Sequence, residues 1–214
     1  WDSAELGVIS GKIMKLEAKG DEIDVKRELI RYVKDFEFLS CRVDAKDFSS
    51  ISALQDEGFK VVDGLIEFVH PNNLGALIQP GVRFGSTDDD EDLRAIAGGA
   101  FKFDRFHVDP KIDNSLADML HMDWVSSSLR GWEQVLVAKN EELIVGFITF
   151  KDNKIGLWCI RKGYRRKGYG SGLIQSALAS MSGVVCSATQ FYNIASIKAH
   201  LANGFVPTKG RYTF

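Results

Sequence analysis

Cysteine is scarce in this sequence of 214 residues, and proline is almost as scarce, at 3 and 4 residues. The cysteines, Cys41, Cys159 and Cys186, are an odd number at scattered spacing. A disulfide framework or a zinc site would need cysteines in pairs at short intervals, so we expect neither. We expect instead three small buried hydrophobic side chains, a reducing compartment and no metal ion.

The sequence also lacks a strong charge bias and a long apolar run. Lys and Arg total 27 against 29 Asp and Glu, which gives a formal net charge of −2 at pH 7. Bulk attraction to nucleic acid or to a membrane is therefore not expected, and any anion site must be local. No apolar run approaches the roughly 18 residues of a membrane-spanning helix, and no basic and apolar leader opens the chain. We expect a soluble cytoplasmic protein.

The most informative stretch joins a predicted strand to a predicted helix. Short apolar runs at 145–150 and 155–160 flank a polar turn and predict a hairpin, and apolar residues recur at helical spacing over 173–181. Between them lies Arg165-Arg-Lys-Gly-Tyr-Gly-Ser-Gly172. Its glycines let the backbone approach a ligand, and the first amides of the helix favour an anion. The pattern predicts a pyrophosphate site, the alternative being a solvated basic loop.

Two segments of the sequence resemble the GNAT N-acetyltransferase superfamily. Arg165-Arg-Lys-Gly-Tyr-Gly170 is similar to its coenzyme A pyrophosphate loop, and Asn193 to Phe205 is similar to its Asn-helix-Gly-Phe unit. The resemblance implies an α+β fold with a mixed, mostly antiparallel sheet and helices on both faces. It also implies direct attack of an amine on the thioester of acetyl-CoA. The cofactor residues that it implies are Cys159, Ile160, Arg161, Arg165, Arg166, Lys167, Gly168, Tyr169, Gly170, Ser171 and Asn193.

His200 stands where many GNAT proteins carry the tyrosine that protonates the leaving thiolate. Histidine titrates near neutrality, so an imidazolium could donate that proton, and His200 is the candidate catalytic acid. The alternative is a surface histidine without a chemical role. Acyl-cysteine catalysis at Cys159 or Cys186 lacks a base pattern nearby, so structural thiols are preferred.

The acceptor is the second question that the sequence addresses. In the aromatic and basic segment 101–110, Arg105 and His107 suit a nucleotide with phosphates, although a salt bridge between His107 and Asp109 is the alternative. The whole chain further resembles GNAT members that acetylate the 4-amino group of a nucleotide-linked dideoxy sugar. The residues that carry this resemblance are Trp1 to Val8, Ala53 to Phe59, Pro71 to Asn73, Ser128 to Gly131, Thr189, Gln190, Asn193 and Lys198.

This second resemblance adds Gln190 to the acceptor-binding candidates. His200 and Ala199 depart from the pattern. Acetylation of a protein N-terminus, acetylation of a small amine and a non-catalytic acyl-CoA sensor remain alternatives, and a homodimer is left open.

The length suits one large domain or two small ones. Sliding Cys41–Phe68 onto Ser187–Phe214 aligns identical residues in the order Ser-Ile-x-Ala, then Gly-Phe, then Gly and Phe. Chance similarity between strand–helix–strand units is the alternative to an internal repeat. We predict a structural, partial GNAT-like domain at 1–75, a linker around 71–80, and a catalytic GNAT domain at 76–214.

Periodicity and capping residues predict the remaining elements. Strands are predicted at 8–16, 38–43, 61–69, 82–84, 134–139, 143–150, 184–189 and 211–214. Helices are predicted at 22–38, 47–58, 86–97, 114–129, 173–181 and 193–202, with an irregular segment at 100–113.

Overall fold

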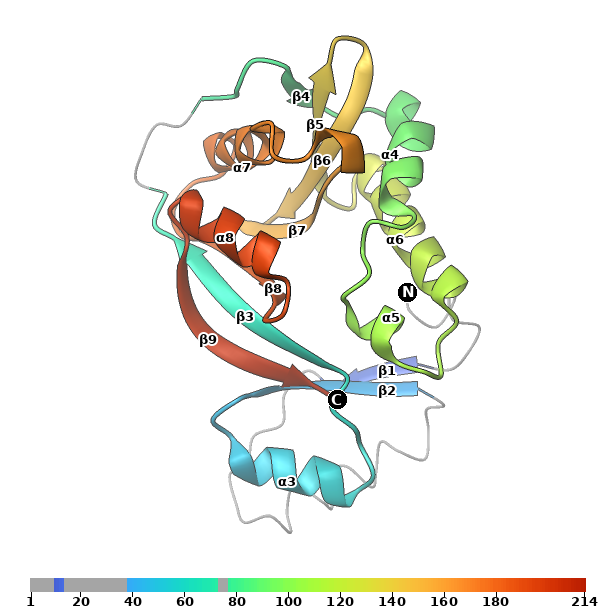
Figure 1. The fold of residues 1–214 in the computed structure, drawn as a ribbon. Helices are drawn as coiled ribbons and strands as arrows, with labels where there is room; N and C mark the ends of the chain where they lie inside the picture. Colours follow the sequence, from blue (N-terminus) through green and yellow to red (C-terminus); the bar gives the residue numbers. More distant parts are fainter. Residues whose placement is uncertain (1–9, 14–37, 73–76) are drawn as a thin grey trace.

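The computed structural model describes residues 10–13, 38–72 and 77–214 (Figure 1). The predicted helix at 22–38 lies almost wholly outside these residues. The described strands form one nine-stranded sheet in the order β1-β2-β9-β3-β8-β7-β6-β5-β4. Their bounds are β1 Ser10–Ile13, β2 Phe38–Asp44, β3 Asp63–His70, β4 Val82–Phe84, β5 Gln134–Asn140, β6 Leu143–Lys151, β7 Lys154–Ile160, β8 Val185–Gln190 and β9 Val206–Thr213.

The pairing of these strands is mixed. β1 pairs with β2 in parallel, as β7 does with β8, and the other neighbours are antiparallel. The helices are α3 Phe48–Asp56, η1 Thr87–Asp89, α4 Asp90–Ala97, α5 Arg105–Val108, α6 Asn114–Leu129, η2 Lys162–Tyr164, α7 Tyr169–Ala179 and α8 Ile194–Ala202. This is the mixed, mostly antiparallel α+β architecture that the sequence predicts.

Helices cover both faces of the β4–β7 part of the sheet (Figure 1). Because side chains alternate between the two faces of a strand, neighbouring residues of β5 pack into different hydrophobic cores. Leu136 and Ala138 pack in the cluster that includes Leu173 and Ile174 of α7. Val135 and Val137 pack on the other face, with buried residues of α4 and α6. The sheet therefore holds the start of α7 in a fixed position relative to the end of β7.

The internal repeat has a structural counterpart. β2-α3-β3 and β8-α8-β9 are both strand–helix–strand units, and their helices begin in the same way. The side chain of Asp47 accepts a hydrogen bond from the Ser50 amide, and that of Asn193 accepts one from the Ser196 amide. Both helices are followed by a glycine at positive φ, as expected for a helix C-terminus.

The two units are also related through the strand register. β2 pairs with β9 at Arg42–Thr213, and the equivalent positions of the other unit pair β3 with β8 at Glu67–Ala188. β3 and β9 pair with each other, with Leu65 opposite Arg211 at the centre. This register is that of an approximate two-fold axis between β3 and β9. Each unit therefore pairs its last strand with the first strand of the other.

The sheet continues across the predicted domain boundary at residue 75. β3, from the N-terminal part of the sequence, lies between β8 and β9 from the C-terminal part. The division into 1–75 and 76–214 stays a prediction, since β2 and β3 share their sheet with the later strands. No helix within the described residues is long and apolar enough to span a membrane.

The repeat generates a prediction about its two helix-terminal glycines. Gly58 and Gly204 have φ values of +84° and +83°, where an added Cβ costs about 1–2 kcal/mol. A Cβ on Gly58 would meet nothing within 4 Å, whereas one on Gly204 would lie 3.1 Å from Nε2 of His70. We expect Gly58→Ala to lower the free energy of unfolding by about 1–2 kcal/mol, and Gly204→Ala to lower it further. Urea unfolding measures both, and equal losses would contradict the role given to His70.

Candidate active site

The loop between β7 and α7 presents uncapped backbone amides. Gly168 is the residue before α7, with φ +90°, and no side chain of the described residues caps the first turn of this helix. The amides of Tyr169, Gly170 and Ser171 therefore have no intrahelical acceptor, and the helix dipole adds positive potential there. An anion is the natural partner for such a group of amides.

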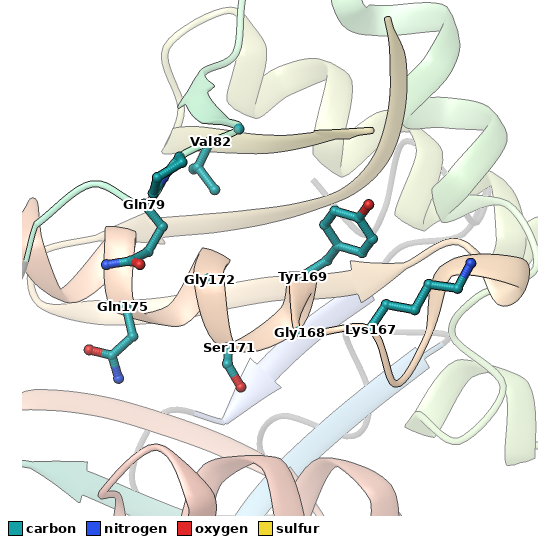
Figure 2. Close-up of a pocket in the computed structure, with 10 residues that line it drawn as sticks. Gln79, Val82, Lys167, Gly168, Tyr169, Ser171, Gly172 and Gln175 are labelled. Atoms are coloured by element: carbon teal, nitrogen blue, oxygen red, sulfur yellow. The ribbon is translucent and has the colours of Figure 1, made fainter. Parts of the chain in front are cut away.

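A pocket of about 400 Å³ opens beside this turn (Figure 2). One wall is the start of α7, and the other is the segment from Gln79 to Val82 before and within β4. The amide of Gln79 donates to Oγ of Ser176 at 2.9 Å, which fixes this second wall against the helix. Among the predicted cofactor residues, those that line the pocket are Lys167, Gly168, Tyr169 and Ser171.

Basic side chains surround the loop in different ways. Arg165 and Arg166 are exposed, and Nε of Arg165 donates to the carbonyl of Ile160 at 3.0 Å. Nζ of Lys167 lies 5.1 Å from the ring centroid of Tyr164. The amide of Arg161 donates to the carbonyl of Val145 at 2.8 Å, so this donor is already used within the sheet. The exposed cations can pair with phosphate without disturbing the fold.

β7 and β8 separate just beyond the start of the ladder. Lys154 and Cys186 are their one register pair among the described residues, and the amide of Cys186 donates to the carbonyl of Asn153 at 2.8 Å. The corresponding parallel pair of the N-terminal unit, β1 with β2, has four register pairs, from Ser10–Phe38 to Ile13–Cys41. Strand edges that lack a ladder can pair with an extended ligand that carries amide groups.

His200 lies beneath this separation, as a core residue. Its side chain stacks on Phe68 at 4.6 Å between ring centroids and is edge-on to Trp158 at 5.6 Å. Nδ1 lies 2.8 Å from the carbonyl oxygen of Ser196, and Nε2 lies 2.8 Å from Oγ of Ser187. A carbonyl only accepts, so Nδ1 carries the proton and Nε2 accepts from the serine.

The environment of His200 differs from both interpretations, the catalytic acid and the surface histidine. The residue is only 2% exposed, so it is not a surface histidine. Burial lowers the pKa of His200, and the hydrogen bond to Ser196 only partly opposes that shift. At pH 7 the ring is neutral and its one proton is held by a backbone carbonyl. The imidazolium required by the predicted acid role is therefore not favoured in this conformation.

Trp158 is a site residue that the sequence reasoning missed. It projects from β7 toward α7, and a Cβ on Gly170 would lie 3.1 Å from its Cζ2. Its indole Nε1 is buried and has no hydrogen-bond partner among the described residues. Buried indole groups normally donate a hydrogen bond, so a ligand between the strands is a suitable acceptor. In the sequence, the feature that could have identified it is a tryptophan, which carries an N–H donor, within the otherwise apolar run 155–160.

The cysteines divide by burial. Cys41 and Cys159 are buried, and burial raises their pKa values to about 11 and about 12. Neither is a ready thiolate nucleophile at neutral pH. Cys186 is exposed, contrary to the expectation of three buried thiols.

Asn193 acts as a helix cap, and nothing in this cap prevents a second contact with a ligand.

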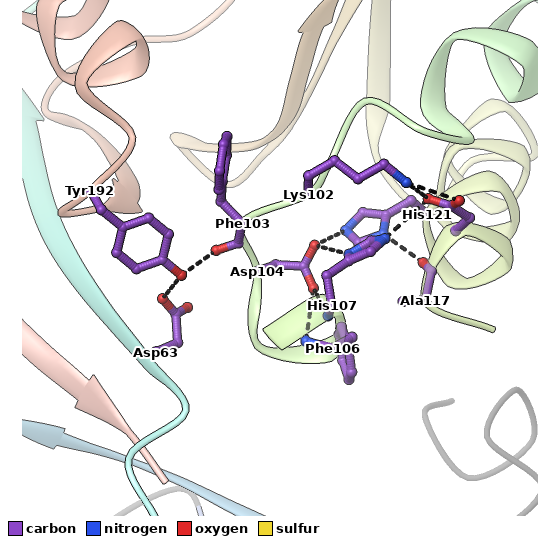
Figure 3. A network of polar contacts seen from close by, with 10 residues as sticks. Asp63, Lys102, Phe103, Asp104, Phe106, His107, Ala117, His121 and Tyr192 are labelled. Atoms are coloured by element: carbon purple, nitrogen blue, oxygen red, sulfur yellow. Dashed lines mark hydrogen bonds and ion pairs between the residues drawn. The ribbon is translucent and has the colours of Figure 1, made fainter. Parts of the chain in front are cut away.

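His107 is placed differently from the prediction. Its side chain is 2% exposed, and its ring nitrogens lie 2.7 Å from Oδ2 of Asp104 and 3.0 Å from Oδ1 of Asp118 (Figure 3). The proposed alternative partner, Asp109, is not among these contacts. The ring is therefore enclosed by carboxylates and does not face an open surface, whereas its neighbour Arg105 lies over the ring of Phe106 at 4.4 Å.

The face of the sheet opposite α3 is polar around Asp63. Cys41 and Val43 pack with α3, so Arg42 between them points to the other face. The register places Arg42, Thr213 and Asp63 in one row across β2, β9 and β3. Arg42 Nε and Thr213 Oγ1 are buried without hydrogen-bond partners among the described residues, which leaves polar groups available to a ligand.

Two predicted acceptor residues reach this polar face. The pKa of Arg42 is lowered by burial first and then by the charge of Arg105, so the two guanidinium groups lie within electrostatic range of each other. Gln190 hydrogen-bonds Asp63, whose pKa is raised by burial despite the opposing effects of its hydrogen bonds and of Arg42. The structure thus brings Arg105 and Gln190 together around a buried carboxyl group.

Tyr192 joins this group to the 98–113 segment (Figure 3). Its hydroxyl lies 2.6 Å from the carbonyl oxygen of Phe103 and 3.1 Å from Oδ1 of Asp63. The hydroxyl has one proton and two acceptors, the carbonyl of Phe103 and the carboxyl group of Asp63. Burial raises the pKa of Asp63, and the hydrogen bond that it accepts from Tyr192 opposes that shift.

Residues 101–205 match the acetyltransferase (GNAT) family. This match spans α5, α6, the β7–α7 loop and α8. Together with the fold and the anion-binding turn, it shows that the chain belongs to the GNAT acetyltransferase family.

The sequence is also similar to two proteins of sugar metabolism. It is 22% identical to the spore coat polysaccharide biosynthesis protein SpsD of Bacillus subtilis (strain 168), over 100% of this chain and 80% of that protein. It is 26% identical to the dTDP-fucosamine acetyltransferase of Escherichia coli O6:H1, over 78% of this chain and 75% of that protein. Among solved structures, the GCN5-related N-acetyltransferase from Kribbella flavida matches with a TM-score of 0.61 and 16% identity, over 90% of this chain and 75% of that one.

The loop geometry predicts a difference between two of its glycines. We expect Gly168→Ala to weaken acetyl-CoA binding at least about 10-fold, because a Cβ at φ +90° costs about 1–2 kcal/mol and stands beside the anion-binding amides. Gly163→Ala is the matched control, since Gly163 also has open space around it but no positive φ. Calorimetric titration with acetyl-CoA measures both, and equal affinities for the two variants would contradict the assignment of the turn.

The burial of His200 predicts a pH dependence of stability. Its pKa is lower in the folded than in the unfolded state, so the unfolded state binds more protons below about pH 6.5. The stabilisation that the neutral His200 gives to the folded state is fully present above that pH and is lost as the pH falls. Leu54 occupies the equivalent position of the other unit. The variant His200→Leu should therefore lose less stability on acidification than the wild type, by up to about 1.4 kcal/mol per pH unit. Urea unfolding at neutral and mildly acidic pH measures the difference, and an unchanged slope would contradict the prediction.

Proposed function

We propose that the protein transfers the acetyl group of acetyl-CoA to the amino group of a nucleotide-linked amino sugar. The family gives acetyl transfer, and the similarity to a dTDP-fucosamine acetyltransferase suggests the acceptor class. The observation that carries the proposal is the polar sheet face around Asp63. The charges of Arg105 and Arg211 both act on Arg42 there, so guanidinium groups from three separate elements lie on this face, and Arg211 is also paired with Glu67 at 2.7 Å.

Arginine is the residue best suited to the diphosphate of a nucleotide sugar. Its planar fork donates two parallel hydrogen bonds to phosphate oxygens, and the buried Nε of Arg42 has a donor to offer. Phe103 and Tyr192 are exposed and meet edge-on at 5.9 Å, and so provide ring faces for a base or a sugar. A peptide N-terminus or a simple amine would make no use of this cluster.

On the donor side, the Arg165–Ser171 turn would hold the pyrophosphate of coenzyme A. The arm of the cofactor would then lie between β7 and β8, where the strands separate, and the indole N–H of Trp158 would donate a hydrogen bond to it. Main-chain groups at the end of β7, from Cys159 to Arg161, would orient the thioester carbonyl. The acceptor amine attacks the thioester carbon to form a C–N bond, the C–S bond breaks, the nitrogen releases one proton to give the amide, and the thiolate takes up one proton to give the thiol.

We also propose that the N-terminal unit binds no cofactor. Its parallel strands β1 and β2 keep their ladder, and it has no counterpart of the Arg-Arg-Lys-Gly loop. A cytoplasmic location and a reducing environment follow as expectations from the two substrates.

The acceptor class is tested by turnover with four amines. Thiol release from acetyl-CoA would be followed with dTDP-4-amino-4,6-dideoxygalactose, the same amino sugar without the nucleotide, a peptide and a simple amine. We expect the nucleotide-linked sugar to have a kcat/KM at least about 100-fold higher than the free sugar, since paired charge-assisted hydrogen bonds contribute about 3 kcal/mol. A preference for the peptide or the simple amine would overturn the proposal.

A variant pair tests where the acceptor binds. Arg105→Ala should raise KM for the nucleotide sugar at least about 10-fold, from the loss of one hydrogen-bonded charge, and leave KM for acetyl-CoA unchanged. Arg130→Ala, at an exposed arginine that follows α6, is the matched control and should change neither value. Equal changes in both KM values for Arg105→Ala would indicate a general effect on folding and would contradict direct acceptor binding.

A further inference from the structure

Three side chains that could bind a metal ion lie close together at the contact between α5 and α6 (Figure 3). They come from Asp104, which caps α5, from His107 on α5, and from His121 on α6. The possible ligand atoms of these residues all lie within 4.8 Å of one another. We propose that they form a binding site for a divalent transition metal ion of the zinc type.

One nitrogen of each ring is hydrogen-bonded on the side away from Asp104. Nδ1 of His121 lies 2.8 Å from the carbonyl oxygen of Ala117, which only accepts, so Nδ1 carries the proton. Nε2 of His107 lies 3.0 Å from the carboxylate of Asp118, which can accept a hydrogen bond from it. The other nitrogen of each ring, Nδ1 of His107 and Nε2 of His121, faces Asp104 and can act as a metal ligand.

Asp104 completes the site with an oxygen that its cap does not use. Oδ1 accepts from the amides of Phe106 and His107, at 2.8 and 3.3 Å. Oδ2 lies 2.7 Å from Nδ1 of His107 and 3.5 Å from Nε2 of His121. One carboxylate oxygen and two ring nitrogens thus face one another within 4.8 Å. A divalent cation between them could be bound by all three atoms.

The distances favour the cation at the His121 side. A hydrogen bond between nitrogen and oxygen is normally about 2.7–3.2 Å long, and 3.5 Å exceeds that range. Two ligands on one tetrahedral zinc ion, with bonds of about 2.0–2.1 Å, lie about 3.3 Å apart. The 2.7 Å contact of His107 would open by about 0.6 Å to admit the ion, which a rotation of the carboxylate allows.

The surroundings have the form of a metal site. Histidine ligands usually donate their second N–H to a carboxylate or a backbone carbonyl, as His107 does to Asp118 and His121 to Ala117. Asp118 is itself held by Lys102 at 3.1 Å. The side chains of His107, His121 and Asp104 are only 2%, 6% and 16% exposed, so a bound ion would be largely shielded from water. One coordination position would remain for a water molecule.

No sequence pattern marks this site, because its residues do not have the close spacing of a metal-binding motif. His107 and His121 are 14 residues apart, and only the packing of α5 on α6 brings them together. An ion here would fix the short helix α5 to α6. It would thereby also fix the main chain on either side of Arg105.

The test is metal binding by the purified full chain after removal of metals with a chelator. We expect one equivalent of Zn²⁺ to bind in calorimetric titration and to raise Tm, because ligand binding to the folded state alone stabilises it. Co²⁺ should give the visible absorption of a four- or five-coordinate ion. Imidazole nitrogen NMR should show shifts of two histidines, out of the 4 in the chain.

Three variants locate the site. Asp104→Asn keeps a good helix cap but loses the anionic ligand, and should weaken Zn²⁺ binding at least about 100-fold. Asp118→Asn, which only orients His107, should weaken it about 10-fold. His70→Gln is the matched control for adventitious histidine binding and should change nothing. His121→Gln provides a second ligand variant if Asp104→Asn fails to fold.

Two results would overturn the proposal. One is the absence of a bound equivalent of Zn²⁺, with the imidazole NMR signals unchanged on addition of the metal. The other is equal Zn²⁺ affinity in the wild type, Asp104→Asn and His121→Gln, which would mean that the ion binds elsewhere. Neither result depends on the acetyl acceptor, so the proposed function is tested separately.

Discussion

The antiparallel pairing of β3 with β9 is the interaction on which the rest of the structure depends. It joins two strand–helix–strand units across an approximate two-fold axis, with Leu65 opposite Arg211. Through it, β8 gains a partner on the side away from β7. β8 can then part from β7 and still be held in the sheet, since β3 pairs with it on the other side. The backbone groups of β8 that face β7 are left for a ligand.

Local sequence signals were sufficient where the structure is decided locally. The helix at 114–129 was predicted with its observed bounds, because Asp113 caps it. The glycine turn before α7 and the repeat of Gly58 at Gly204 were also found from sequence, since positive φ leaves a mark in residue choice. The same holds for the GNAT fold, whose motifs are short and continuous in sequence.

Features that depend on distant contacts were missed or misread. β9 was predicted only at 211–214, yet it begins at Val206, because pairing with β3 makes a strand of a polar segment that includes Pro207. α5 is too short to show periodicity, and contacts of His107 with Asp104 and Asp118 hold it. His200 was read by its position in a motif, whereas burial beside Phe68 determines its proton.

The exchange of strands between the two units also bears on how the chain can assemble. Each unit completes the sheet of the other, so the same register would be satisfied if the two units came from different molecules. Such an intermolecular exchange would create no new contact and lose none within β2, β3, β8 and β9. What favours the single-chain form is the high local concentration of one unit around the other. The length of chain between β3 and β4 would then decide which of the two forms can be made.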